Sequence, residues 1–411
     1  MRLRFDPALL REVVDYWVQE RRLLRQGLSA LAISTAVGMA AGVVLASMQG
    51  LLEELPGLLA LVPAAIGMRG AIFGTLGARL GTGILTGQYE TTLRRGSFTA
   101  QNVEAAVLLT LASSALAAVA ARVLASSFGL PTISVWELMI VSMVGGVLSS
   151  AVILAGVLLL ARAAHRRSWD MDAIGSPIIT ATGDMVTLPA LVVATLLLTN
   201  PLVDTIAGVL LAVVAVAAVV RGFVSRQPIT RRIVRESLPV LTYAASIDIL
   251  AGTVLETRLE TFISSDALFV LIPPFIANCG SLGGIASARL GSDLHLGLIT
   301  PRRWPEKLAG FEASLVFLFG FAAFTGLGLV AHVAALVGGF ASPGAGTMVG
   351  ISLTAGVLAF GLLFLVAYYA ATATYRFGLD PDNHAIPIVT ATMDFLGVLC
   401  LVAAITTWGV S

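Results

Sequence analysis

The chain has 411 residues, of which 57% are hydrophobic and only 12% are charged, and its mean hydropathy is +0.93. A soluble fold could not cover so apolar a core with polar surface, so the composition excludes a soluble protein and predicts an integral membrane protein. Cys279 and Cys400 both lie in apolar stretches, and no Cys/His cluster exists, which argues against disulfides and against zinc or iron–sulfur sites.

The first 26 residues form a charged arm. The arm mixes arginines with acidic residues, and apolar sequence begins only after Arg25. This pattern argues against a cleavable signal and predicts an amphipathic cytoplasmic helix at the membrane surface over residues 1–26.

Apolar windows of about 20 residues follow, each long enough to cross the ~30 Å hydrocarbon layer of a bilayer. The sequence therefore predicts an all-α integral membrane protein with eleven transmembrane helices, near residues 28–50, 58–81, 102–125, 137–162, 174–199, 203–221, 238–256, 267–290, 308–337, 347–371 and 385–408. Because the number is odd, we expect the two termini on opposite sides of the membrane.

Basic residues gather on one side of this arrangement. That side receives the arm and the basic clusters at residues 94–95, 162–167, 221–235, 302–307 and 376, whereas Arg122 and Arg258 fall on the other side. Cytoplasmic loops carry an excess of arginine and lysine. We therefore expect a multi-pass protein of the cell membrane with a cytoplasmic N-terminus and an extracellular C-terminus.

The sequence repeats itself at an offset of 210 residues. The matching positions are Pro63/Pro273, Gly70/Gly280, Gly74/Gly284, Arg79/Arg289, Asp172/Asp382, Pro177/Pro387, Thr180/Thr390 and Asp184/Asp394. The repeat predicts four parts: the arm 1–26, a first five-helix repeat 27–200, a linker transmembrane helix 201–225, and a basic segment plus a second five-helix repeat 226–411.

The linker helix fixes how the repeats are related. Each repeat begins with a basic cytoplasmic segment and contains five spans, so an extra span must return the chain between them. The repeats are then parallel, related by a pseudo-twofold axis along the membrane normal. We expect a single-chain pseudo-dimer whose pathway lies between the two halves.

Asp184 and Asp394 are the leading functional candidates. Each lies ~12 residues into a helix that starts at the cytoplasmic face, which at 1.5 Å per residue places the carboxylate ~18 Å deep. Acids at that depth are costly and usually mark an ion pathway. Two of them meeting on one axis would repel each other unless a divalent cation lay between them.

Oxygen ligands surround these acids. Thr180 and Thr390 share a helix face with the aspartates, and the prolines at 177 and 387 free backbone carbonyls one turn earlier. Such oxygen ligands suit a hard cation such as Mg²⁺, held through its waters. The predicted metal ligands are Asp184, Asp394, Thr180, Thr390, Asn383 and the carbonyl of Ala173, with Asp172 and Asp382 as helix-capping residues or part of a cytoplasmic mouth.

Four further charged residues are candidates for coupling or gating. Arg69 is central in its span, and its counterpart Cys279 breaks the repeat; it needs an acidic partner, for which Asp248 is a candidate. Glu104 and Glu312 open the third span of each repeat, where they cap the helix or line a cytoplasmic mouth.

These motifs resemble the two halves of solute carrier family 41, itself a fused duplication of the membrane domain of MgtE-type magnesium channels. The resemblance rests on Pro63 to Arg79, on Asp172…Pro177…Asp184 and on Asp382…Pro387…Asp394. It implies transport of Mg²⁺ and sometimes of other divalent cations, with Asp184 and Asp394 as pore-lining ligands. The chain departs from the family where Ala71 replaces a usual asparagine and where Met393 precedes the second aspartate.

The leading hypothesis is therefore divalent cation transport, most of all of Mg²⁺, in the lipid bilayer, with neither an enzymatic activity nor a nucleic-acid partner. A channel and an exchanger coupled to Na⁺ or H⁺ both remain open. A rival is an intramembrane aspartyl protease, in which two buried acids activate water. Ala181-Thr182-Gly183-Asp184 lacks the first glycine of the usual protease motif, however. A membrane scaffold is a third alternative.

Overall fold

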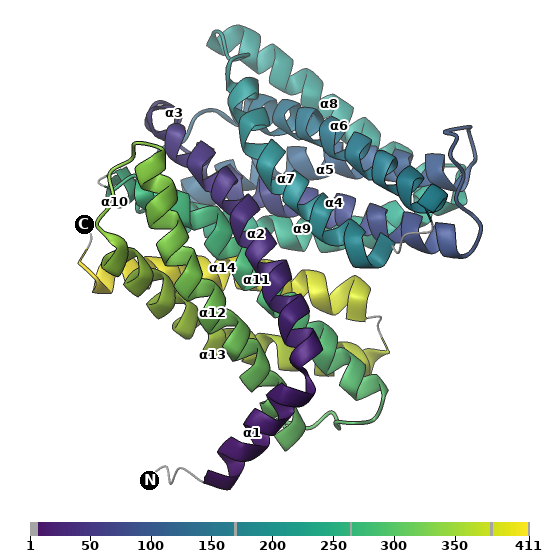
Figure 1. Cartoon of the computed structure of the whole chain (residues 1–411). Coiled ribbons are helices and arrows are strands. Elements are labelled where there is room, and N and C mark those ends of the chain that lie inside the picture. Colours follow the sequence, from purple (N-terminus) through teal and green to yellow (C-terminus); the bar gives the residue numbers. More distant parts are fainter. Residues whose placement is uncertain (1–6, 168–170, 264, 379–380, 410–411) are drawn as a thin grey trace.

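A computed structural model describes residues 7–167, 171–263, 265–378 and 381–409, and within these ranges the chain is all-helical, with no strand (Figure 1). This confirms the predicted all-α class. The helices of the first repeat and the link that follows are α2 (Arg21–Ser47), α3 (Gln49–Glu54), α4 (Leu58–Leu85), α5 (Phe98–Ser127), α6 (Val135–Arg167), α7 (Met171–Thr195) and α8 (Pro201–Val224). The remaining helices are the N-terminal α1 (Pro7–Gln19) and, in the second repeat, α9 (Pro228–Glu256), α10 (Leu259–Ile263), α11 (Ala267–His295), α12 (Lys307–Val337), α13 (Ala345–Phe377) and α14 (Pro381–Thr407).

Ten of these helices are long and apolar enough to cross a membrane over their described residues. The helix expected as the eleventh span is α7, whose described apolar part is 182–195. The chain is therefore a multi-pass membrane protein with two helical repeats, and the count of eleven spans stays a prediction.

Local sequence signals set several helix ends. The side chain of Asn200 accepts a hydrogen bond from Val203 N (3.1 Å) ahead of Pro201, which starts α8. Ser97 caps α5 in the same way through Ala100 N (3.1 Å). Gly378 ends α13 with a positive φ of 64°, a backbone conformation that glycine adopts without steric cost.

The two repeats exchange their first helices. In sequence α2 belongs to the first repeat, yet it packs against α11 and α12 of the second, and Figure 1 shows it running across that part of the molecule. Its counterpart α9 packs against α4 and α5 of the first repeat. Neither repeat is therefore complete without a helix from the other.

A glycine lies at each of these exchanged contacts. A methyl group on Gly252 of α9 would lie 2.7 Å from both Cα and the carbonyl carbon of Ala60, and would overlap its oxygen. One on Gly42 of α2 would meet the backbone of Val270 in the same way, with its Cα at 2.9 Å. Only glycine permits such close backbone approach, so the exchange depends on these two residues.

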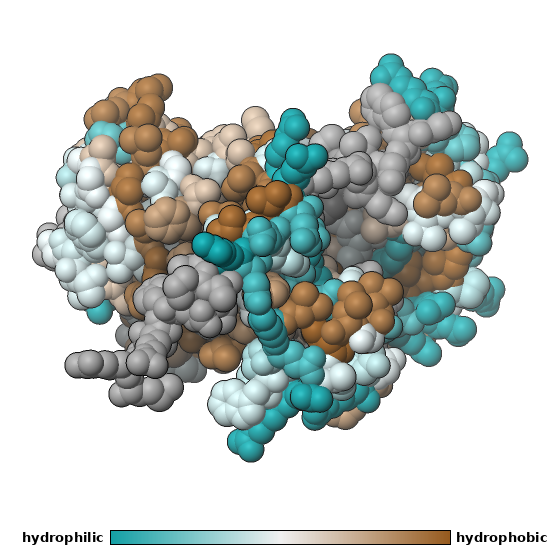
Figure 2. Space-filling model, turned by 60° about the horizontal axis from the view of Figure 1, so that its bottom comes forward, coloured by the Kyte–Doolittle hydropathy of each residue, from teal (hydrophilic) through white to brown (hydrophobic). Residues whose placement is uncertain are grey.

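Apolar side chains remain exposed along the outer faces of the bundle. The linker helix α8 exposes Leu210 (62%) and Val216 (63%), and α12 exposes Val337 (84%). Figure 2 shows a strip of hydrophilic residues crossing one face of the molecule, with apolar patches on either side of it. Large apolar faces of this kind are suited to contact with lipid chains.

The arm helix α1 is tied to the second repeat by polar contacts. The hydroxyl of Tyr16 donates to Glu312 of α12, and Trp17 Nε1 donates to Ser314 Oγ (3.1 Å). Glu312 also pairs with Arg289 at the end of α11. Burial, followed by the hydrogen bond to Glu312, raises the pKa of Tyr16, so the phenol keeps its proton in the physiological range.

Replacing Glu312 with Gln should lower the unfolding temperature and loosen α1. The change leaves Arg289 with only the longer ion pair to Glu20 (4.0 Å), and removing one partner of a buried ion pair costs about 3–5 kcal/mol. Arg289 is 23% exposed, which places the cost at the lower end or below it. Thermal unfolding and protease cleavage of the arm in detergent measure both effects, with the exposed pair variant Glu236→Gln as the control. An unchanged unfolding temperature would contradict this role for Glu312.

Candidate cation pathway

Six helices form a closed ring where the two repeats meet. In the order α7, α2, α11, α14, α9 and α4, each helix packs against the next, and α4 packs against α7 again. We call this arrangement the six-helix ring. The exchanged helices α2 and α9 complete it, because each bridges one repeat to the other. The ring therefore combines the fifth, first and second transmembrane helices of both repeats.

Three buried carboxylates come from helices of this ring. Asp184 of α7 is 5% exposed, Asp394 of α14 is 8% exposed, and Asp248 of α9 is 2% exposed. Asp184 and Asp394 belong to helices on opposite sides of the ring, and Asp248 belongs to α9, which packs against both α14 and α4. The structure thus places the two predicted aspartates and one of the predicted coupling residues on helices of the same ring.

Glycines on the second helix of each repeat make room for these acids. A methyl group on Gly280 of α11 would lie 2.8 Å from Asp394 Oδ1 and 2.9 Å from Thr390 Cγ2. On the other side, one on Gly67 of α4 would lie 2.6 Å from Asp248 Oδ2. Gly280 is the repeat counterpart of Gly70. In the structure it leaves open the space beside a carboxylate.

Of the two threonines predicted as ligands, Thr390 is the one whose side chain the structure describes. Its hydroxyl donates to Ile386 O (2.8 Å), one turn earlier on α14, which leaves the oxygen lone pairs as acceptors toward an ion or water. The side chains of Thr180, Asp172, Ala173, Asp382 and Asn383, which the sequence analysis also assigned to the site, lie outside the described residues.

No ready-made metal cage exists among the described side chains, since no three His, Cys, Asp or Glu groups converge closely enough to share one ion. Asp184, Asp248 and Asp394 therefore do not form a compact cluster of metal ligands.

The predicted pairing of Arg69 with Asp248 is wrong. Arg69 Nη2 donates to Ser114 Oγ of α5 (2.7 Å), and neither Nε nor Nη1 has a partner. Asp248 lies against Gly67, and positions two residues apart on a helix are about 200° apart around its axis. The two charged groups therefore lie on opposite faces of α4.

The other two gating candidates are engaged in ion pairs. Glu104 of α5 pairs with Arg221 of the linker helix α8 (2.6 Å), and Glu312 pairs with Arg289. Sequence reasoning missed Tyr243 of α9, whose hydroxyl lies 2.9 Å from Thr392 Oγ1 on α14. No motif marks that tyrosine, since its counterpart in the first repeat is Ile33.

Comparison with known proteins agrees with the duplicated architecture. Solute carrier family 41 member 3 from Mus musculus is 25% identical over 354 residues, which covers 79% of this chain and 69% of the mouse protein. No solved structure matches the chain.

A family description, "MgtE: Divalent cation transporter", matches the chain twice, at residues 62–194 and 272–404. The matched segments begin and end 210 residues apart, as the repeat requires, and they contain Asp184 and Asp394. They favour a transporter over the protease alternative. Because they cover more than half of its length, this chain belongs to the MgtE family of divalent cation transporters.

Proposed function

We propose that this protein moves Mg²⁺ across the membrane through the six-helix ring, with Asp184 and Asp394 as the central ligands. The observation that supports this most directly is that two buried acids at repeat-equivalent positions belong to helices on opposite sides of this ring. Family membership supports the general class of cargo, a divalent cation.

Charge balance is the physical reason for a divalent cargo. Two carboxylates that face each other in a poorly hydrated place repel, and one ion of charge +2 neutralises both. Arg69 is directed away from Asp248 toward α5, and no described arginine or lysine pairs with Asp184 or Asp394. The positive charge at this place is therefore left for the transported ion to supply.

Oxygen chemistry is the reason to choose Mg²⁺ among divalent ions. Gly280 leaves space beside Asp394 and Thr390, and the Thr390 hydroxyl keeps its lone pairs available to an ion. Hard oxygen ligands and space for water suit Mg²⁺, which dehydrates reluctantly. Transition metals that prefer sulfur or nitrogen gain nothing from such ligands.

The proposal includes the orientation and assembly of the chain. We place the N-terminus in the cytoplasm and the C-terminus outside, and we take the single chain as the functional pseudo-dimer. The exchange of α2 and α9 supports the latter, since each half of the ring already contains a helix from the other repeat.

Asp248 favours coupling as a second mechanism. Its repeat counterpart is Gly38, so this acid gives the second repeat a charge that the first lacks. Its Oδ1 atom has no hydrogen-bond partner among the described residues, and its helix packs against α14, which carries Asp394. A proton or Na⁺ bound at Asp248 would alter the affinity of Asp394 for Mg²⁺, which is the requirement for a coupled exchanger.

Uptake into vesicles tests both the cargo and the coupling. Purified protein in liposomes should take up Mg²⁺, and Mn²⁺ and Ca²⁺ more slowly, as followed with an ion-sensitive dye inside the vesicles. If Asp248 binds the coupling ion, an opposing Na⁺ or proton gradient should accelerate uptake by wild type, and Asp248→Asn should remove that acceleration. Vesicles that take up Ca²⁺ but no Mg²⁺ would overturn the proposed cargo.

A further inference from the structure

The first repeat contains a buried positive charge without an anionic partner among the described residues. Arg69 is 1% exposed, and its only hydrogen bond to a described residue goes to the neutral hydroxyl of Ser114. The single N–H of Nε and the two of Nη1 reach no acceptor. A guanidinium does not lose its proton in proteins, and an unpaired charge inside a membrane protein is strongly destabilising. This arginine therefore needs a negative charge from elsewhere.

The guanidinium lies where α4, α5 and α6 meet. Gly146 of α6 faces it so closely that a methyl group there would overlap both Arg69 Nη2 and Ser114 Oγ. One turn before Ser114 on α5 and one turn after Gly146 on α6, Thr110 Oγ1 and Ser150 Oγ lie 3.3 Å apart. Ser114, Thr110 and Ser150 are buried, at 1%, 3% and 8% exposed. A positive charge and three hydroxyls thus share one helix junction.

Hydrogen-bond donors outnumber acceptors at this junction. The hydroxyl of Ser114 accepts from Arg69 and donates to no described group, and only one hydrogen is used between Thr110 and Ser150. Asp184 follows Gly183, which lies beside the Arg69 side chain, yet no ion pair joins Asp184 to the guanidinium. Unused N–H and O–H donors around a positive charge are the ligands of an anion.

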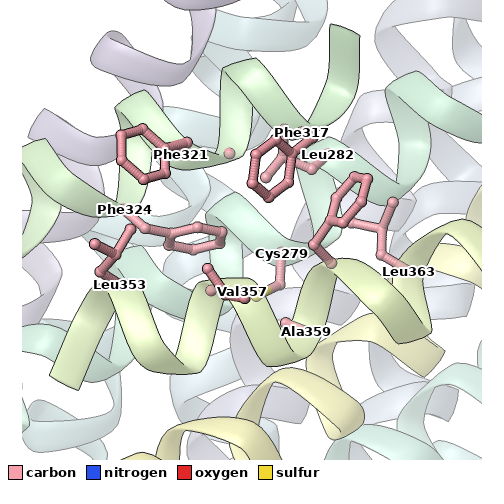
Figure 3. A pocket seen from close by; sticks show the side chains of 12 residues that line it. Cys279, Leu282, Phe317, Phe321, Phe324, Leu353, Val357, Ala359 and Leu363 are labelled. Carbon is pink, nitrogen blue, oxygen red and sulfur yellow. The ribbon is translucent and has the colours of Figure 1, made fainter. Parts of the chain in front are cut away.

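The same place in the second repeat has the opposite chemistry. Cys279 stands in place of Arg69, Phe324 in place of Ser114, and Phe360 in place of Ser150. Figure 3 shows the result, a pocket among Cys279, Phe324 and neighbouring apolar side chains between α11, α12 and α13. The surrounding scaffold is otherwise kept. Ser142 and Ser352 donate to the carbonyls of Ser114 and Phe324 with the same distance of 2.7 Å. The difference is therefore confined to the polar junction itself.

We propose that the first repeat binds one small monovalent anion of the halide class at this junction, held by Arg69 and by the hydroxyls of Ser114, Thr110 and Ser150. A single guanidinium charge calls for a single negative charge. The close approach of Gly146 favours a small ion. The site lies on the face of α4 opposite Gly67 and Asp248, where α4 meets α5 and α6, and its occupation does not depend on the function proposed above.

Halide binding can be measured on the whole purified protein with chloride and bromide as probes. In chloride, the unfolding temperature should rise with concentration and saturate, relative to gluconate at equal ionic strength, because the ion binds the folded state only. In crystals grown with bromide, one anomalous scattering peak is expected at hydrogen-bond distance from the Arg69 guanidinium and Ser114 Oγ.

Variants separate this site from general salt effects. Gly146→Ala places a methyl group against both Arg69 Nη2 and Ser114 Oγ and should abolish the chloride response. Gly156→Ala on the same helix, where nothing lies within 4 Å, should keep it. Arg69→Cys installs the residue of the second repeat and should also abolish the response, whereas Cys279→Ala should not.

Two results would overturn the proposal: a wild-type protein with the same unfolding temperature in chloride and gluconate, or bromide peaks that avoid Arg69. Should Arg69→Cys fail to fold, the wild-type bromide positions and the pair of glycine variants still decide the question. Loss of Mg²⁺ transport would not bear on it, because the readouts are halide position and thermal stability.

Discussion

Replacing Asp184 and Asp394 together with Asn should abolish Mg²⁺ uptake into vesicles while leaving the protein folded. The amides keep the size of the side chains but remove both negative charges. Loss of a buried charged partner costs about 2–5 kcal/mol of binding free energy. Because each 1.4 kcal/mol is tenfold, we expect flux to fall on the order of a hundredfold. Each single variant should already lose most of the flux, because one remaining carboxylate cannot neutralise a divalent ion.

The matched control is Asp204→Asn. Asp204 is also buried, at 3% exposed, but it lies on the linker helix α8, where it accepts from Thr199 N (3.1 Å) outside the six-helix ring. Its replacement should leave uptake near the wild-type rate. Unfolding temperatures of all variants, with and without Mg²⁺, separate lost transport from lost folding. Wild-type flux in the double variant would refute the role of the aspartate pair.

The sequence was sufficient to predict the helical membrane class, because apolar windows long enough to span a bilayer recur along the chain. The 210-residue offset makes Asp184 and Asp394 equivalent. That two equivalent residues near a pseudo-twofold axis approach each other is a prediction from symmetry. The count of eleven spans and the ligand roles of these acids remain predictions.

The exchange of α2 and α9 could not be predicted, because a repeat shows which helices correspond but not which half each one packs against. Gly42 and Gly252 were visible as small residues, yet packing partners depend on tertiary contacts. The partner of Arg69 was predicted wrongly for a related reason, because only acids were considered. Aligning the repeats at Ser114 and Phe324 would have revealed the polar junction on the other face of α4.

Substituting Ala for Gly252 should strongly destabilise the fold. The added methyl would lie 2.7 Å from Cα of Ala60 and would overlap its carbonyl oxygen, so backbone rather than a flexible side chain would have to move. Overpacking of well-packed cores typically costs about 1–3 kcal/mol, and displaced backbone belongs at the upper end. The variant should unfold at a clearly lower temperature in detergent and give less monodisperse protein.

Gly326 on α12 offers a matched control for the close contact at Gly252. Gly326→Ala on α12 adds the same methyl where nothing lies within 4 Å, so it should leave stability unchanged or slightly raised, because alanine has the higher helix propensity. Gly42→Ala should behave like Gly252→Ala, because its methyl would meet Val270 in the equivalent crossing. The two crossings join different helix pairs, so the costs should be roughly additive. If Gly252→Ala unfolds at the same temperature as wild type, α9 does not cross α4 this closely, and the six-helix ring loses one of the two close crossings that join the repeats.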